Sequence, residues 1–145
     1  MNPLSPKIYQ KLIQTCKYFF IKNPIIVFEK LFLDFKENIA HLNHFGKPFN
    51  MTNFTFKIWV INEFHNAARN TLLFHTSSMI RKIHRCDAKE LYLSHQEISL
   101  NEFIFLSPNI KIISLNCTPV KNEDGTILPL EKLVTYLPNA INIRL

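Results

Sequence analysis

A spaced pattern of apolar residues, apolar-x-x-apolar-x-apolar, recurs five times along the chain. Four units fit the pattern fully, and one begins with threonine instead. The units are Phe28/Leu31/Leu33, Thr55/Ile58/Val60, Ala88/Leu91/Leu93, Ile110/Ile113/Leu115 and Ala140/Ile143/Leu145. An apolar-x-apolar alternation is typical of a strand with one buried face, so the pattern predicts one short strand at the end of each unit.

The distances between the units indicate how these strands are arranged. Successive units begin 27, 33, 22 and 30 residues apart, which brackets the repeat length of leucine-rich solenoids. Each repeat of such a solenoid contributes one strand to a curved parallel sheet. The spacing therefore predicts an α/β fold, namely a short leucine-rich-repeat-like solenoid with a parallel sheet of about five strands and helices on the other face.

The last two units share a longer pattern. A helix-like run, "SLNEFIFL" in one and "PLEKLVTYL" in the other, leads through a Pro-Asn pair into the strand, and Pro108 and Pro138 lie 30 residues apart. Proline just beyond a helix end is a common stop signal. Ser99-x-x-Glu102 also has the form of a capping box at the start of the first run. Helix, Pro-Asn turn and strand thus form a unit that is used twice.

The remaining segments predict a helix at the N-terminus and a mixed middle part. Ser5-Pro6 is expected to open a helix that runs to about Asn23, because Ser can cap and Pro suits the first turn. We expect residues 36–50 to be a connection with a short helical turn, and residues 62–85 to form one or two helices. The apolar stripe of the first helix is expected at Ile8, Leu12, Cys16 and Phe19, with Ile13 and Phe20 beside them.

The middle residue of each apolar-x-apolar strand should point away from the core, since strand side chains alternate. This predicts a row of partner-binding residues along the exposed sheet face: Phe32, Trp59, Tyr92, Ser114 and Arg144. Trp, Tyr and Arg contribute much of the energy of protein interfaces. The alternative is that the N-terminal helix simply covers Phe32 and Trp59.

The last predicted strand, Ile141 to Leu145, coincides with the end of the sequence. A solenoid normally ends in a polar cap that protects its core and its sheet edge. We therefore expect another chain or a second copy in an edge-strand dimer to cover this edge, unless the chain is a shortened relative of a longer protein.

Composition and charge favour one intracellular domain. The 145 residues suffice for one core, and no stretch reaches the ~18 apolar residues that a membrane span needs. The N-terminus has no cleavable apolar segment, so we expect a cytoplasmic or nuclear location. The net charge is +6, and residues 1–58 contain eight lysines and three acidic residues. These lysines are spread singly, which makes an ordinary solvated surface the main interpretation and a small basic nucleic-acid-binding protein the alternative.

Candidate chemistry is sparse, and we interpret the chain as non-catalytic. Three cysteines far apart suit a reducing compartment, and we expect Cys16 and Cys117 in the core and Cys86 as the cysteine worth labelling. His41-x-x-His44 and His84-x-Cys86 do not make the separated ligand pairs of a metal site. Phosphate-loop, nucleophile-elbow and zinc-protease motifs do not occur, and the two glycines argue against a phosphate cradle, so we expect no cofactor.

Longer stretches of the sequence resemble a known family. "SPKIYQKLIQTCKYFFIKNP" is similar to the closing helix of an F-box-like segment in nematode proteins, and "AKELYLSHQEISLNEFIFL" with "LPLEKLVTYLPN" resembles their leucine-rich-like tail. The resemblance divides the chain into a partial F-box-like segment, residues 1–24, and a leucine-rich-repeat-like α/β domain, residues 25–145. A full F-box begins with a Leu-Pro pair and two earlier helices, from which this chain departs. The F-box likeness is carried by Leu12, Cys16, Lys17 and Phe20.

The resemblance implies the substrate-receptor subunit of a cullin-type ubiquitin ligase. In such a subunit the F-box docks on the linker protein of the ligase, and the repeats hold the target. Together with the repeated pattern, it predicts a non-catalytic protein-protein interaction module.

Overall fold

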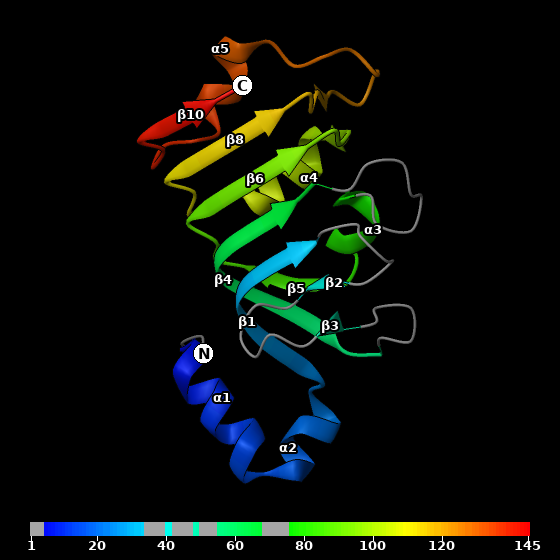
Figure 1. Ribbon diagram of the computed structural model, residues 1–145, viewed down its shortest axis with the longest axis vertical. Helices are drawn as coiled ribbons and strands as arrows, with labels where there is room; N and C mark the ends of the chain where they lie inside the picture. The colour runs from blue at the N-terminus through cyan, green and yellow to red at the C-terminus, as the bar shows by residue number, and fades with distance from the viewer. Residues whose placement is uncertain (1–4, 34–39, 42–47, 50–54, 68–75) are drawn as a thin grey trace.

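A parallel β-sheet is the centre of this α/β protein, whose computed structural model is shown in Figure 1. The structure describes residues 5–33, 40–41, 48–49, 55–67 and 76–145. The six-stranded main sheet has the order β1-β4-β6-β8-β10, with β5 paired to β4, and all of these pairings are parallel. Its strands are β1 (Ile25–Leu33), β4 (Lys57–Asn66), β5 (Ile83–Cys86), β6 (Glu90–Ser94), β8 (Ile112–Asn116) and β10 (Asn142–Arg144). The predicted α/β class and parallel sheet are confirmed.

Helices and two small sheets complete the described part of the chain. The strands β2 (Ala40–His41) and β3 (Pro48–Phe49) pair antiparallel, whereas β7 (Ile98–Ser99) and β9 (Val120–Lys121) pair parallel. The helices are α1 (Pro6–Thr15), α2 (Lys17–Lys22), α3 (Thr76–Ile80), α4 (Leu100–Leu106) and α5 (Leu130–Thr135). Figure 1 shows β1, β4, β6, β8 and β10 side by side in chain order, with α1 and α2 next to the β1 end of the sheet.

The register aligns the middle apolar residues of four of the five repeated units and replaces that of the second unit. The aligned row is Leu31, Phe64, Leu91, Ile113 and Ile143. Ile58 was expected in this row, but it pairs with Ile26 and Ile83 instead. The physical reason is the length of β4, whose first residues pair with β1 and β5 and whose last residues pair with β1 and β6.

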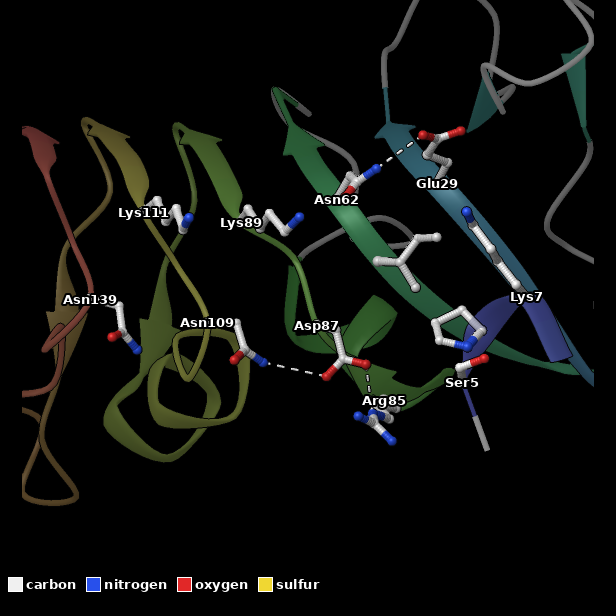
Figure 2. Close-up of a pocket in the computed structure, with 12 residues that line it drawn as sticks. Ser5, Lys7, Glu29, Asn62, Arg85, Asp87, Lys89, Asn109, Lys111 and Asn139 are labelled. Atoms are coloured by element: carbon white, nitrogen blue, oxygen red, sulfur yellow. Dashed lines mark hydrogen bonds and ion pairs between the residues drawn. The ribbon is translucent and has the colours of Figure 1, made fainter. Parts of the chain in front are cut away.

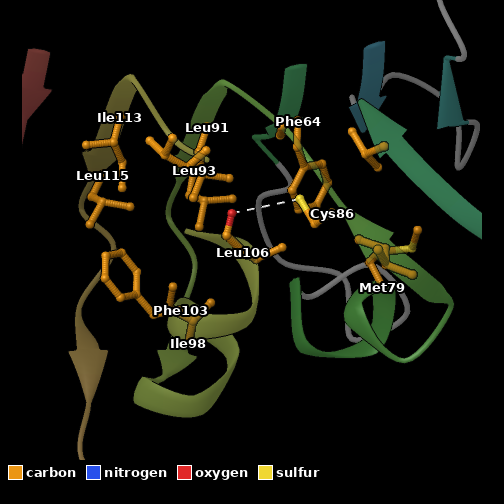
Figure 3. Close-up of a cluster of buried hydrophobic side chains, with 14 of the residues drawn as sticks. Phe64, Met79, Cys86, Leu91, Leu93, Ile98, Phe103, Leu106, Ile113 and Leu115 are labelled. Carbon is orange, nitrogen blue, oxygen red and sulfur yellow. Dashed lines mark hydrogen bonds between the residues drawn. The ribbon is translucent and has the colours of Figure 1, made fainter. Parts of the chain in front are cut away.

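One face of the sheet carries the main hydrophobic core. Side chains of the aligned row pack there against α3, α4 and the end of α5, as Figure 3 shows for the central strands. Leu91, Ile113 and Phe103 are fully buried in this cluster. The alternating sequence pattern predicted strands with one buried face and helices on one side of the sheet, and this arrangement agrees with it. The core therefore holds α3, α4 and α5 on a single side of the sheet.

The opposite face is covered near the N-terminus by α1. Trp59 points to this side, because its neighbours Ile58 and Val60 belong to the main core and strand side chains alternate. Tyr9 of α1 meets Trp59 edge to face with ring centroids 5.9 Å apart. With Val27 they form a second, smaller buried cluster. This cluster fixes α1 to β1 and β4.

The N-terminal segment contains two helices and not the single predicted one. They meet at Cys16, whose φ of −130° and ψ of 94° are extended. The expected stripe is correct only in part. Leu12 is partly buried and Phe19 packs on the smaller cluster, but Ile8 is 50% exposed, Cys16 is exposed, and Tyr9 is buried in their place. The reason is that α1 meets Trp59 and Val27 with the face that carries Tyr9 and Ile13.

Local end signals are confirmed where they were predicted. The Ser5 Oγ accepts a hydrogen bond from the Ile8 N–H at 3.4 Å, and Pro6 begins α1. Ser99 and Glu102 form the capping box of α4. The helices expected at 62–85 are found only in part: α3 is helical, but β4 continues to Asn66 and β5 follows α3, and residues 68–75 lie outside the described residues. Most of the expected connection at 36–50 lies outside the described residues.

Candidate functional site

The candidate site is a row of side chains on the sheet face opposite the main core. Register places five residues from neighbouring strands in line, and we call them the contact row: Phe32, His65, Tyr92, Ser114 and Arg144. They alternate with the aligned core residues, so they point away from α3, α4 and α5. The first four are partly exposed and Arg144 is exposed.

The structure places four of the five predicted contact residues in this row and replaces Trp59 by His65. Trp59 is 4% exposed and lies beneath Tyr9 of α1. Its indole Nε1 donates to Asp87 Oδ2 at 2.8 Å, and Arg85 lies over the ring at 4.8 Å. The alternative that the N-terminal helix covers the aromatic residue therefore holds for Trp59.

Phe32, His65 and Tyr92 form a stacked aromatic ladder. The ring centroids of Phe32 and His65 are 4.2 Å apart at an interplanar angle of 24°, and those of His65 and Tyr92 are 4.2 Å apart at 19°. Neighbouring strands lie roughly 4.8 Å apart, so flat rings in register can stand on the sheet and stack on one another. Both faces of the imidazole are thereby occupied, and the edge of the ring is its remaining contact surface.

Charged side chains two residues earlier on the same strands form hydrogen bonds with the ladder. The Glu63 carboxylate forms an ion pair with the Lys30 amine, and Glu63 Oε2 lies 3.2 Å from His65 Nε2. The Tyr92 hydroxyl donates to Glu90 Oε2 at 2.8 Å. Lys30, Glu63 and Glu90 are themselves aligned by register. The ring positions are thus fixed by hydrogen bonds as well as by stacking.

These contacts shift the protonation of the ladder in known directions. Burial lowers the pKa of His65 below its usual 6.5, although the neighbouring Glu63 carboxylate opposes this effect. The imidazole is therefore neutral at neutral pH, and a proton on Nε2 would be donated to Glu63. The ion pair with Lys30 lowers the pKa of Glu63, and the hydrogen bond to Glu90 raises the pKa of Tyr92. The rings of the ladder are therefore uncharged at pH 7, beside the charged Glu63 carboxylate.

The arrangement does not assemble a nucleophile with a base. Ser114 lies two strands from His65, with Tyr92 between them, and no hydrogen bond joins the two side chains. Within the part of the chain that the structure describes, no three His, Cys, Asp or Glu side chains gather to hold a metal ion. Of the histidines considered for a metal, the side chains of His41 and His44 lie outside that part. The open face offers apolar ring edges, a hydroxyl and a guanidinium for contact.

The cysteine expectations are wrong. Cys16 and Cys117 were expected in the core but are exposed, whereas Cys86 is buried. Burial raises the pKa of the Cys86 thiol to about 11, and its Sγ donates to the carbonyl of Leu106 at 3.8 Å. The polarity of the flanking residues does not predict the burial of these cysteines, because burial depends on which face of a strand or helix a residue occupies. Cys86 faces the main core from β5.

The F-box-like residues do not lie on one continuous helix. Leu12 belongs to α1, and Lys17 and Phe20 belong to α2, with Cys16 at the break between them. Leu12 and Phe20 are partly buried, while Cys16 and Lys17 are exposed.

His65 and Glu63 are the site residues that the sequence pattern missed. The alternation that begins at Trp59 continues through Ile61 and Glu63 to His65, beyond the end of the apolar unit. Extending that alternation would have found both residues. A strand of ten residues was needed to place them.

Comparison with family models, curated proteins and solved structures gives no significant match for this chain. Among the described residues, no helix is both long and apolar enough to cross a membrane.

Proposed function

We propose that this chain is a non-catalytic protein-interaction module of leucine-rich solenoid type, and that the contact row binds its partner. The carrying observation is the stacked ladder of Phe32, His65 and Tyr92, which is continued by Ser114 and Arg144 on the face opposite the main core. Tyr and Arg are among the residues that contribute most to interface energy. A ladder that is already stacked loses little side-chain entropy on binding.

The solenoid part of the proposal is supported by recurring local structure. After α4 the Ile110 N–H donates to the Ser107 carbonyl at 3.2 Å, and after α5 the Ala140 N–H donates to the Leu137 carbonyl at 3.1 Å. Each turn contains the Pro-Asn pair and leads directly into β8 or β10. Each of these strands pairs in parallel with the preceding strand of the sheet.

The ladder favours a protein partner over nucleic acid. Single-stranded nucleic acids bind aromatic side chains through the faces of their bases. His65 has no free ring face, because Phe32 and Tyr92 occupy both sides. Carboxylates of Glu63 and Glu90 also lie beside the rings and would repel phosphates. Ring edges beside hydrogen-bonding groups suit protein side chains better.

Affinity capture with the full chain tests the contact row. We compare the wild type with Tyr92→Ala/Arg144→Glu and with a control, Glu131→Lys/Lys132→Glu, which swaps exposed charges on α5. A protein bound through the contact row should bind the first variant about 30-fold more weakly, since losing a central Tyr and Arg contact costs about 2 kcal/mol. Quantitative mass spectrometry followed by titration of the captured protein measures this. Equal affinity of wild type and contact-row variant would remove the proposal.

The ubiquitin-ligase role belongs to the same proposal and has its own test. The F-box-like residues Leu12, Cys16, Lys17 and Phe20 would contact the linker protein of a cullin-type ligase. Purified linker protein should then bind the full chain, and Phe20→Ala should weaken that binding. Absence of binding would leave an interaction module without a ligase role.

A further inference from the structure

A polar depression lies beside the contact face, where the chain enters the strands. It has a volume of about 890 Å³ and extends from the start of α1 across the residues that precede β6, β8 and β10 (Figure 2). Lys89 and Lys111 line it and come directly before Glu90 and Ile112, the first residues of β6 and β8. The depression therefore adjoins the face that carries the contact row.

Three lysine amines in this depression have no anionic partner among the residues that the structure describes. Lys7, Lys89 and Lys111 form no ion pair with any residue that the structure describes. The fourth basic side chain in the lining, Arg85, already has an anionic partner, because its Nε lies 2.7 Å from Asp87 Oδ2. Lys89 and Lys111 lie at the same level, each one residue before its strand, since the Lys111 N–H donates to the Lys89 carbonyl at 2.7 Å. The depression thus offers unpaired positive charge at defined positions.

Asparagine side chains supply the second kind of contact. The Asn109 amide donates to Asp87 Oδ1 at 3.4 Å, and the Asn139 amide donates to the Pro108 carbonyl at 3.1 Å. These bonds orient the amides, while their Oδ1 atoms accept no hydrogen bond from the described residues. An oriented amide oxygen is suited to accept a hydrogen bond from a peptide N–H.

We propose that the polar depression binds an acidic, extended segment of the partner protein. Carboxylates of that segment would pair with Lys89 and Lys111, and its backbone N–H groups would meet Asn109 and Asn139. Alternate side chains of an extended peptide lie about 6.8 Å apart, a distance that the flexible side chains of lysines preceding strands roughly 4.8 Å apart can span. The inference rests on the proposed protein-binding function, because the segment would belong to the protein on the contact row.

Charge complementarity favours this occupant over a nucleic acid. The lining contains the carboxylates of Asp87 and Glu29 beside the lysines. A continuous phosphate backbone would meet these carboxylates, whereas a peptide can place its acidic side chains only where the lysines are. The Glu29 side chain accepts from the Asn62 amide at 3.0 Å, so its position is also fixed.

Fluorescence anisotropy with a labelled peptide of alternating glutamate and serine tests the inference. The full chain should bind this probe, and Lys89→Gln/Lys111→Gln should weaken binding about tenfold, as expected for the loss of two exposed ion pairs. Lys11→Gln/Lys132→Gln changes the net charge equally, at exposed positions outside the depression, and should leave binding unchanged. Added salt should weaken binding of the wild type.

Three outcomes would overturn the inference: no binding of the acidic probe, equal loss in both double variants, or tighter binding of an oligodeoxythymidylate that depends on the same two lysines. The last outcome would assign the depression to nucleic acid. Tyr92→Ala/Arg144→Glu separates this inference from the proposed function. If that variant loses the captured protein while the acidic probe fails to bind the wild type, the proposed role of the contact row is supported and only the proposal of an acidic segment is refuted.

Discussion

Alanine substitutions of two consecutive residues in β6, one at a time, test which face of the sheet is the core. Leu91 is 0% exposed and lies between Phe64 and Ile113 in the aligned row, whereas Tyr92 points to the open face and stacks on His65. Leu91→Ala removes buried methyl groups and leaves a cavity, which costs about 3 kcal/mol of unfolding free energy. Tyr92→Ala loses one aromatic stack and one hydrogen bond at a partly exposed site, which costs about 1 kcal/mol.

Urea unfolding followed by circular dichroism measures both values on the full chain. A small domain is stable by about 5–15 kcal/mol, so the Leu91 variant should still fold and should unfold at a clearly lower urea concentration. Leu93→Ala serves as a second core variant, because Leu93 is also buried and on the same face. If Tyr92→Ala cost as much as Leu91→Ala, the assignment of the two faces would be refuted.

Three further predictions concern single groups. A thiol reagent should label Cys16 and Cys117 in the native protein and Cys86 only after unfolding, because Cys86 is buried and its pKa is raised to about 11. Lowering the pH through about 6.5 should reduce the free energy of unfolding of the wild type, because burial lowers the pKa of His65 and the unfolded chain therefore binds the proton first. In urea unfolding at several pH values, His65→Phe should reduce this dependence of the unfolding free energy on pH. Glu102→Ala should lower the free energy of unfolding by about 1 kcal/mol in thermal unfolding, because it removes the hydrogen bonds that the Glu102 carboxylate accepts from the Ser99 N–H and the Ser77 hydroxyl.

Local signals predicted the C-terminal half of the fold well. The capping box at Ser99 and the Pro-Asn turns depend on residues close in sequence. Such signals act through hydrogen bonds and backbone sterics over a few residues, so one sequence is enough to find them. The elements around β8 and β10 therefore lie close to their expected positions.

The register of β4 could not be predicted from the same pattern. Ile58 and Phe64 are both apolar and both point to the core, so either could align with Leu91. The choice depends on β5, which occupies the position next to Ile58 and leaves Phe64 to pair with β6. This competition between strands is a tertiary effect, and it moves the contact row from Trp59 to His65.

The N-terminal segment illustrates a second limit. Helical spacing suggested one helix with Ile8 and Cys16 on its buried side, but neither glycine nor proline marks the break at Cys16. The buried side is set by Tyr9, which meets Trp59 and donates its hydroxyl to the Asn23 carbonyl at 2.7 Å. The surface of β1 and β4 against which α1 packs decides the orientation of α1. The sequence of the helix alone carries no information about that surface.

Proton nuclear Overhauser contacts of the Tyr92 ring test the central claim most directly, because the ladder exists only if β4 and β6 pair in this register. We expect strong contacts from Tyr92 to the His65 ring, whose centroid is 4.2 Å away, and further contacts to Ser114 on the adjacent strand. Contacts from Tyr92 to Trp59 in place of His65 would contradict the register and with it the contact row.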